Sequence, residues 1–414
     1  MTATRPALTE HDVSTFVRLR CFAPTAPDRI GIESEWLTTR LDEPASPVSP
    51  ESTLQAIDGA APLPGESTIT FEPGGQIELS SPALVGLERV CGAIAQDLSL
   101  VRKSLAESGI RMTALGREPF RAPLRCLRVA RYEAMEAFFE SMGPEGKTMM
   151  CNTAALQINL DGGSSAEQVA RRWRLAHLIG PALAAAFANS PFAGGAPTGW
   201  RSSRLALWWA MDPSRTTPVP ASFDPAAAWA HYALRARVMM IRRSDSAFVP
   251  VTEPMTFAHW MSHGHALGWP TLEDFSYHLT TLFPPVRPRG YLELRMIDSL
   301  PDPWWRAAVG VMTALLYDEQ SAGEASAATA SASGLWVEAF RYGLHQPELR
   351  TAADALFRIA LEALPRVGAD PLTLDAVAAF HDRYVGRGRC PADDLLYGWL
   401  RKGSMDPIHG ELEA

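Results

Sequence analysis

Four short segments of this chain alternate apolar residues with polar ones, and their polar positions carry mainly carboxylates and amides. They span residues 31–38, 76–80, 153–161 and 290–298. Because side chains alternate between the two faces of a strand, the spacing predicts four β-strands with one apolar and one polar face each. This pattern is typical of an antiparallel sheet that buries one face.

The polar faces contain an unusual set of side chains. They comprise Glu33, Glu35, Glu72, Glu78, Gln157, Asn159, Glu293 and Arg295. A solvated sheet face is the usual reason for such alternation, but solvated faces mix Lys, Thr, Ser and Glu. Clustered carboxylates repel one another unless cations lie between them, and carboxylate oxygens suit Mg²⁺, which often bridges to substrate phosphates. We therefore favour a platform for metal and nucleotide over a solvated face.

Residues 72–76 read Glu-Pro-Gly-Gly-Gln and separate two β-rich runs. Pro fixes φ and Gly permits positive φ, so the segment predicts a tight hairpin turn within residues 69–80. The backbone of such a turn can approach a ligand closely.

The rest of the chain indicates long helices between scattered strands. Apolar residues spaced by three and four predict helices over residues 1–20, 86–107, 166–189, 225–241 and 304–317, of which the third can break at Pro181. Residues 42–67 are expected to form a loop, and residues 320–334 a mobile loop or an Ala-rich helix. Residues 335–400 look wholly helical. We expect an α+β fold and a single domain over residues 1–414.

Charge and cysteine content narrow the class of protein further. The net charge is −8 and no basic stripe stands out, which argues against a nucleic-acid partner. No apolar run reaches the 20 or so residues that a membrane span needs. The five cysteines are widely spaced and form no zinc motif, which favours reduced thiols. We expect a cytoplasmic protein; its oligomeric state stays open.

Several stretches resemble the glutamate–cysteine ligase family, specifically the actinobacterial enzymes that begin ergothioneine synthesis. The matching stretches are residues 31–36 (GIESEW), 71–80 (FEPGGQIELS), 153–161 (TAALQINLD), 203–209 (SRLALWW) and 277–295 (YHLTTLFPPVRPRGYLELR). They follow one another in the family's order over roughly residues 8–400.

This resemblance implies a fold and a reaction. The fold would be related to glutamine synthetase, with a funnel-like antiparallel sheet and surrounding helices. The reaction would use ATP and Mg²⁺: the γ-carboxylate of glutamate is phosphorylated, and the amine of cysteine displaces the phosphate to give γ-glutamylcysteine. In phosphoryl transfer the protein mainly positions the reacting groups and neutralises the charge of the phosphates. Cations bound by Glu and the side chains of Arg can do both.

The resemblance also implies roles for individual residues. The metal-binding carboxylates would be Glu33, Glu35, Glu72, Glu78 and Glu293, and the catalytic pair Glu293 and Arg295. Arg295 and Arg289 would contact ATP. Substrate contacts would come from Arg204, which holds the α-carboxylate of glutamate, and from Gln157 and Asn159. Gln157 stands where many relatives have a metal-binding His.

Two other functions are compatible with the same residues. One is a related carboxylate–amine ligase with a different amine acceptor, and the other is a non-catalytic relative that binds a nucleotide. Five retained carboxylates favour an enzyme, because a non-catalytic relative need not keep them together.

Overall fold

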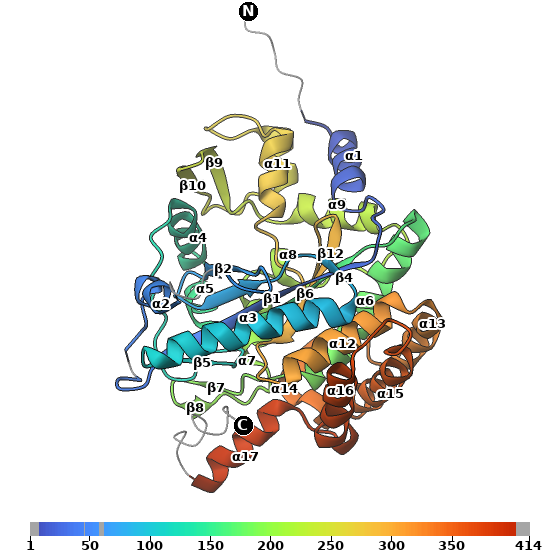
Figure 1. The fold of residues 1–414 in the computed structure, drawn as a ribbon. Coiled ribbons are helices and arrows are strands. Elements are labelled where there is room, and N and C mark those ends of the chain that lie inside the picture. The colour runs from blue at the N-terminus through green and yellow to red at the C-terminus, as the bar shows by residue number, and fades with distance from the viewer. Residues whose placement is uncertain (1–7, 45, 58–61, 403–414) are drawn as a thin grey trace, which may run out of the picture.

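An antiparallel sheet lies at the centre of the molecule (Figure 1). The computed structural model describes residues 8–44, 46–57 and 62–402. The strands run in the order β11 (Val286–Pro288), β12 (Tyr291–Asp298), β6 (Ala155–Asp161), β1 (Arg29–Arg40), β3 (Ile77–Ser80) and β2 (Thr68–Phe71), while β4 (Leu84–Val85) and β5 (Ile110–Thr113) also pair with β1. Two separate hairpins are β7 (Phe192–Ala193) with β8 (Ala196–Pro197), and β9 (Met240–Ser244) with β10 (Ala247–Pro250).

Helices surround this sheet. The first part of the chain contributes α1 (Glu10–Arg20), α2 (Pro50–Ile57), α3 (Leu87–Glu107), α4 (Ala130–Glu140), α5 (Glu145–Asn152), α6 (Ala166–Ala186), α7 (Ser203–Met211), α8 (Pro213–Thr216) and α9 (Pro225–Arg235). The second part contributes α10 (Phe257–His263), α11 (Leu272–Leu279), α12 (Trp304–Tyr317), α13 (Glu319–Ala328), α14 (Trp336–Tyr342), α15 (Pro347–Ala363), α16 (Pro371–Arg383) and α17 (Pro391–Lys402), with short 3₁₀ turns at Gly343–His345 and Val385–Arg387.

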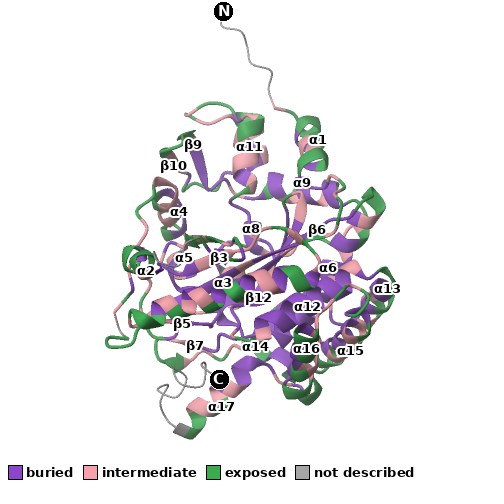
Figure 2. Cartoon of the chain, in the orientation of Figure 1, coloured by how far each residue is buried: buried purple, intermediate pink, exposed green. Residues whose placement is uncertain are grey.

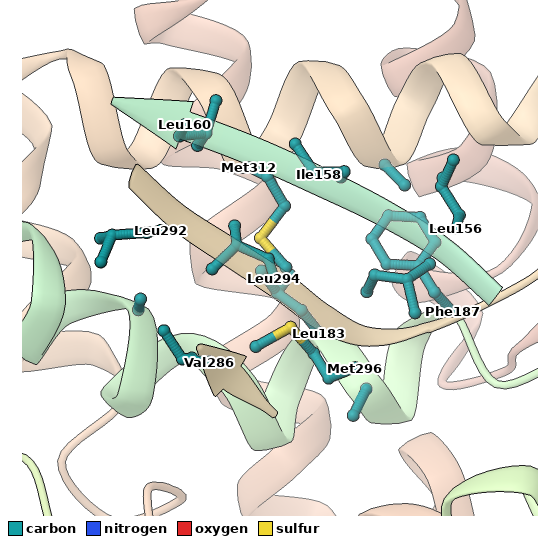
Figure 3. Packing of buried hydrophobic residues seen from close by; sticks show 14 of the residues in the cluster. Leu156, Ile158, Leu160, Leu183, Phe187, Val286, Leu292, Leu294, Met296 and Met312 are labelled. Carbon is teal, nitrogen blue, oxygen red and sulfur yellow. The ribbon is translucent and has the colours of Figure 1, made fainter. Parts of the chain in front are cut away.

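The apolar face of the sheet is buried against α6 and α12. Figure 3 shows Ile158 and Leu294 of two neighbouring strands beside Leu183 of α6 and Met312 of α12. All four side chains are fully buried, and Figure 2 shows α12 as buried over most of its length. Burial of apolar area at this layer stabilises the sheet by about 25 cal/mol per Å², and it fixes which face of each strand is left for polar residues.

The strand register brings the polar positions together on the opposite face. Glu35 pairs with Glu78, Glu33 with Gln157, and Glu293 on β12 with Asn159 on β6. Directly paired residues in an antiparallel ladder point to the same face. The sheet therefore gathers these side chains on one side, as the alternation predicts.

Strand β12 contains an irregularity that the alternation does not predict. Leu294 pairs with Ile158, but Ile297 pairs with Leu156, so β12 has one more residue than β6 between these two pairs. Such a bulge reverses the facing of the residues beyond it. Asp298 consequently pairs with Ala155 and lies on the polar face, whereas unbroken alternation would turn it to the apolar one.

Most of the predicted elements are confirmed, including the α+β class, the antiparallel sheet, the hairpin and the long helices. Two predictions are wrong. Residues 42–67 are not all loop, because Ser49 caps α2 through Ser52 N–H and Pro50 occupies its first position, an ordinary helix start. Residues 225–241 do not form one helix: α9 ends at Arg235, since Ala236 is extended, and β9 follows.

Two open alternatives are also resolved by the structure. Helix α6 continues through Pro181 without a break, and the Ala-rich segment forms α13 as far as Ala328. Residues 1–7 of the predicted first helix, and residues 58–61 of the predicted loop, lie outside the described residues. Over the described ranges no helix is long and apolar enough to cross a bilayer. The single domain over residues 1–414 stays a prediction.

Candidate active site

The polar side of the sheet opens into a cavity of about 200 Å³. It is lined by Glu33, Glu35, Glu72, Pro73, Glu78, Arg131, Tyr132, Met135, Met149, Met150, Thr153, Gln157, Arg204, Trp208, Thr280, Phe283, Arg287 and Arg295. Four of the five predicted metal ligands, one predicted catalytic residue and two predicted substrate contacts are in this set. Asn159, Arg289 and Glu293 are not.

Three carboxylates form a compact group on one wall. One oxygen from each of Glu35, Glu72 and Glu78 lies within 4.8 Å of the others. Glu35 and Glu78 come from paired strands, and Glu72 comes from the turn that joins β2 to β3. Oxygen atoms at this spacing suit a hard divalent cation.

The turn that carries Glu72 depends on its two glycines. Gly75 has a φ of +87°, and a Cβ at Gly74 would lie 2.1 Å from the backbone oxygen of Cys151. The tight turn is therefore confirmed, but its backbone approaches the end of α5 at Gly74. The close packing fixes Glu72 against the sheet.

Burial and mutual repulsion perturb the carboxylate group. Burial, and then the charge of Glu78, raise the pKa of Glu35 to about 7. Burial and the charges of Glu35 and Glu78 raise the pKa of Glu72 well above its usual range. Without a cation the group holds protons at a pH where exposed carboxylates are ionised. A bound cation would relieve the same repulsion.

Glu33 lies beside this group on β1 and lines the cavity. Its Oε1 accepts a hydrogen bond of 2.8 Å from Nδ2 of Asn159. Burial and the neighbouring charges of Glu293 and Glu78 raise the pKa of Glu33. Asn159 thus contacts Glu33 and not the cavity itself. Its own Oδ1 is buried without a hydrogen-bond partner among the described residues.

Glu293 has different surroundings from the other four carboxylates. It is fully buried, and its oxygens accept hydrogen bonds from Arg287 at 2.6 and 2.9 Å, from Arg289 at 3.0 Å and from Arg295 at 3.0 Å. Burial would raise the pKa of Glu293, but the charges of Arg287 and Arg295 outweigh it and hold the pKa well below its usual range. Glu293 therefore does not join the three-carboxylate group; in this structure it gathers three arginines.

Arg295 and Gln157 connect the two groups of charges. The guanidinium of Arg295 donates to Glu293 and to Oε1 of Gln157, and Nε2 of Gln157 donates to Glu35 at 2.7 Å. Arg295 also lies 5.5 Å from the ring centre of Trp208. This chain of contacts holds Arg295 at the cavity wall, whereas Arg289 keeps a side chain that is 48% exposed.

Arg204, the second residue of α7, also lines the cavity. It is only 2% exposed, and its Nη2 donates to the backbone oxygen of Arg295 at 3.0 Å. Its Nε and Nη1 are buried and form no hydrogen bond within the described residues, although Nη1 lies 3.5 Å from Oδ1 of Asp298. Buried donors are rarely left unpaired in proteins, so this guanidinium is available for an anionic ligand.

Several lining residues were not among the sequence candidates. The charged and aromatic ones among them are Arg131, Tyr132, Trp208, Phe283 and Arg287. Phe283 and Arg287 lie within the stretch 277–295 that carries the family resemblance, and this was the available signal. Trp208 is one of two adjacent tryptophans, which more often indicate a core. Arg131 and Tyr132 begin α4, and only the packing of α4 brings them to the cavity.

The carboxylates and arginines that line this one cavity define a site for a divalent cation and anionic substrates, as in enzymes that transfer phosphate to a carboxylate. The sequence model of glutamate-cysteine ligase family 2 (GCS2) matches residues 29–413. This chain belongs to that family. The predicted family, and with it the predicted enzyme class of glutamate–cysteine ligase, is thereby confirmed.

Curated relatives agree with this assignment. The chain is 42% identical over 373 residues to glutamate–cysteine ligase EgtA of Mycolicibacterium smegmatis, covering 89% of this chain and 86% of the relative. It is 40% identical over 406 residues to EgtA of Mycobacterium tuberculosis, covering 94% and 91%. A chloroplastic glutamate–cysteine ligase of Arabidopsis thaliana is 32% identical over 370 residues, covering 84% and 69%.

A solved structure shares the fold. It is a glutamate–cysteine ligase of Francisella tularensis in complex with AMP, with a TM-score of 0.58 and 13% sequence identity, covering 94% of this chain and 88% of that chain. At this identity the likeness concerns the fold alone, and it agrees with the predicted antiparallel sheet surrounded by helices.

Proposed function

We propose that this cavity activates the γ-carboxylate of L-glutamate with ATP and then joins it to the amine of L-cysteine. The products are γ-glutamylcysteine, ADP and phosphate. One observation carries the proposal: the Glu35–Glu72–Glu78 group shares a single cavity with the buried Arg204 and the largely buried Arg295. Such a cavity can bind a cation with phosphates on one side and a carboxylate substrate on the other.

The residues present fit Mg²⁺. Glu35, Glu72 and Glu78 would hold the cation, with Glu33 beside them, because their oxygens are close together and otherwise repel. When bound, Mg²⁺ would neutralise charge on the ATP phosphates and on the transferred phosphoryl group. Glu293 remains a possible ligand only if it exchanges arginine contacts for the cation, so we assign it the role of orienting Arg295.

The protein's own side chains then supply positioning. Arg295 is fixed by Glu293 and Gln157 and contributes a positive charge where the γ-phosphoryl group crosses to glutamate. Phosphorylation makes the carboxyl carbon a better acyl donor, since phosphate is a better leaving group than oxide. The cysteine amine attacks this carbon and phosphate departs.

Arg204 is proposed to hold the α-carboxylate of glutamate through its guanidinium, whose buried Nε has no hydrogen-bond partner among the described residues. A guanidinium fork binds a carboxylate through two parallel hydrogen bonds. Anchoring the α-carboxylate at Arg204 would direct the γ-carboxylate toward the cation held by Glu35, Glu72 and Glu78. Aspartate is one methylene shorter, so its side-chain carboxylate should stop short of the phosphate and react poorly.

The first test is Arg204→Lys, which keeps the charge and loses the fork. We expect the KM for glutamate to rise by about tenfold or more, the size of a lost charge-assisted hydrogen bond, while the KM for ATP stays within about twofold. ADP release would be measured with glutamate or aspartate, with and without cysteine. An unchanged glutamate KM, or aspartate turned over as fast as glutamate, would contradict this assignment, and release that does not depend on cysteine would indicate a different amine acceptor.

A second prediction concerns cation binding and pH. Because the pKa of Glu35 is raised to about 7 and that of Glu72 is also raised, Mg²⁺ must displace protons when it binds. We expect the apparent Mg²⁺ affinity to fall as the pH drops from 8 to 5.5, and proton release to be larger at pH 6 than at pH 8. Titration calorimetry in buffers of different ionisation enthalpy measures both, and pH-independent binding without proton release would exclude this cation site.

The similarity to the enzymes named EgtA supports ergothioneine synthesis as the use of the product. A cytoplasmic location and the absence of a nucleic-acid partner stay predictions.

A further inference from the structure

Asp298 lies beside Arg204 at the end of β12, and it was not among the candidate site residues predicted from sequence. It is 1% exposed, and it reaches the polar side of the sheet only because of the bulge between Leu294 and Ile297. Its Oδ1 is 3.5 Å from Nη1 of Arg204. Asp298 does not line the cavity, so it cannot contact substrate directly.

The carboxylate of Asp298 binds the segment that leads into α7. Its Oδ2 accepts hydrogen bonds from the backbone N–H of Asn189 at 2.8 Å and from Oγ of Ser190 at 2.7 Å, and its Oδ1 accepts from Oγ of Ser202 at 3.0 Å. Three hydrogen-bond donors and the Arg204 guanidinium therefore surround this buried carboxylate and oppose the burial that raises the pKa of Asp298.

The two serines connect Asp298 to the backbone of Arg204. Oγ of Ser202 caps α7 by accepting from the N–H of Leu205, and Oγ of Ser190 accepts from the N–H of Arg204 itself, both at 3.2 Å. The same carboxylate thus fixes the first turn of α7 and attracts the guanidinium of its second residue.

Asp298 has little freedom to move. A Cβ at Gly116 would lie 2.4 Å from its carboxyl carbon, so the backbone of Gly116 closes the space around the side chain. Asp298 and Arg295 also share β12, and the backbone oxygen of Arg295 accepts from Arg204. Strand β12 therefore holds Arg204 at two points.

We propose that Asp298 is a positioning residue for glutamate: it holds the Nη1 side of Arg204 and leaves the opposite edge of the guanidinium, which carries Nε, for the substrate carboxylate. This inference rests on the proposed role of Arg204. Nη1 lies 3.5 Å from Oδ1 of Asp298, which is ion-pair distance, so the aspartate orients the guanidinium through Nη1 and leaves Nε without a partner among the described residues. Loss of this orientation should weaken glutamate binding specifically.

The test compares Asp298→Asn with Asp318→Asn in the full-length protein. Asp318 is also a buried carboxylate that caps a helix and pairs with an arginine, but it does so at α13 and Arg366, away from the cavity. We expect Asp298→Asn to raise the KM for glutamate by about tenfold, the effect of one charge-assisted contact, with the KM for ATP within about twofold. Asp318→Asn should lower the melting temperature and change neither KM.

Ser202→Ala removes one of the three hydrogen bonds and keeps the charge. It should give a smaller rise in the glutamate KM, about threefold. If Asp298→Asn does not fold, the glutamate KM of Ser202→Ala tests the role of Asp298 instead. A glutamate KM that is unchanged in the folded variants, or that moves together with the KM for ATP, would overturn the inference. Arg204→Lys run in parallel separates the two proposals: a high glutamate KM in that variant alone rejects Asp298 and retains Arg204, whereas normal values in both reject both.

Discussion

Glu293→Gln is expected to reduce turnover by about 10²–10³-fold, the cost of losing one preorganised charge at a reacting phosphoryl group. Glutamine keeps the shape of the side chain but removes the charge that gathers Arg287, Arg289 and Arg295. Three arginines without their carboxylate repel one another, so Arg295 should leave its place at the cavity wall. The measurement is kcat under saturating glutamate, cysteine and ATP, with circular dichroism to show that the variant is folded.

Asp212→Asn is the matched control for Glu293→Gln. Asp212 is also buried and bound to an arginine, Arg215, at 2.7 Å, but it does not line the cavity. Both variants should lose stability, because each leaves buried cationic charge uncompensated, and only Glu293→Gln should lose turnover. A Glu293→Gln enzyme within twofold of the wild-type kcat would exclude Glu293 from the catalytic machinery.

Glu72→Gln is expected to abolish most of the activity and to make the metal-free protein more stable. Burial and the charges of Glu35 and Glu78 raise the pKa of Glu72, so its ionised form destabilises the folded state at any pH above its unfolded value. Removing that charge should raise the melting temperature at pH 8 by about 1–3 °C. At pH 5, close to the unfolded pKa of 4.5, the difference should be much smaller, and it should vanish below that pKa.

The same substitution should lower the affinity for Mg²⁺ by about tenfold or more and reduce turnover with it. Glu118→Gln is the opposite control: Glu118 is buried but pairs with Arg121 and accepts from the N–H of Phe120, so neutralising it should destabilise the protein. Thermal unfolding in EDTA at pH 5 and pH 8 measures these signs. A Glu72→Gln protein that is less stable at pH 8 would contradict the repulsion between these carboxylates.

Much of the site could be predicted from sequence because strand alternation is local. Glu33, Glu35, Glu78 and Gln157 occupy alternate positions whose apolar neighbours must be buried, and burial of one face leaves the other to these side chains. Glu72 could be placed because its Pro-Gly-Gly turn has few conformations open to it. The family could be predicted from the sequences of these stretches and from their order along the chain.

Helix boundaries near polar segments were less predictable. The start signal at Ser49 and Pro50 was present but was outweighed by the surrounding prolines and glycines, and the end of α9 depends on Val238 N–H bonding to the distant Met255. Helix propensity depends only on the residues of the segment itself. Hydrogen bonds to distant residues determine where the helix ends and the strand begins.

The sequence by itself determined that a sheet with one apolar face would have carboxylates on its other face. Side chains alternate between the two faces of a strand, so burying the apolar positions leaves all the polar positions on the opposite face. Only the tertiary structure decided which of them act together. Glu35, Glu72 and Glu78 form the cation group because their strands pair in one register, while Glu293 binds arginines from β11 and β12. Asp298 faces the polar side of the sheet, next to Arg204, because β12 contains a bulge of a single residue. A bulge depends on how two strands pair, so the sequence of neither strand alone predicts it.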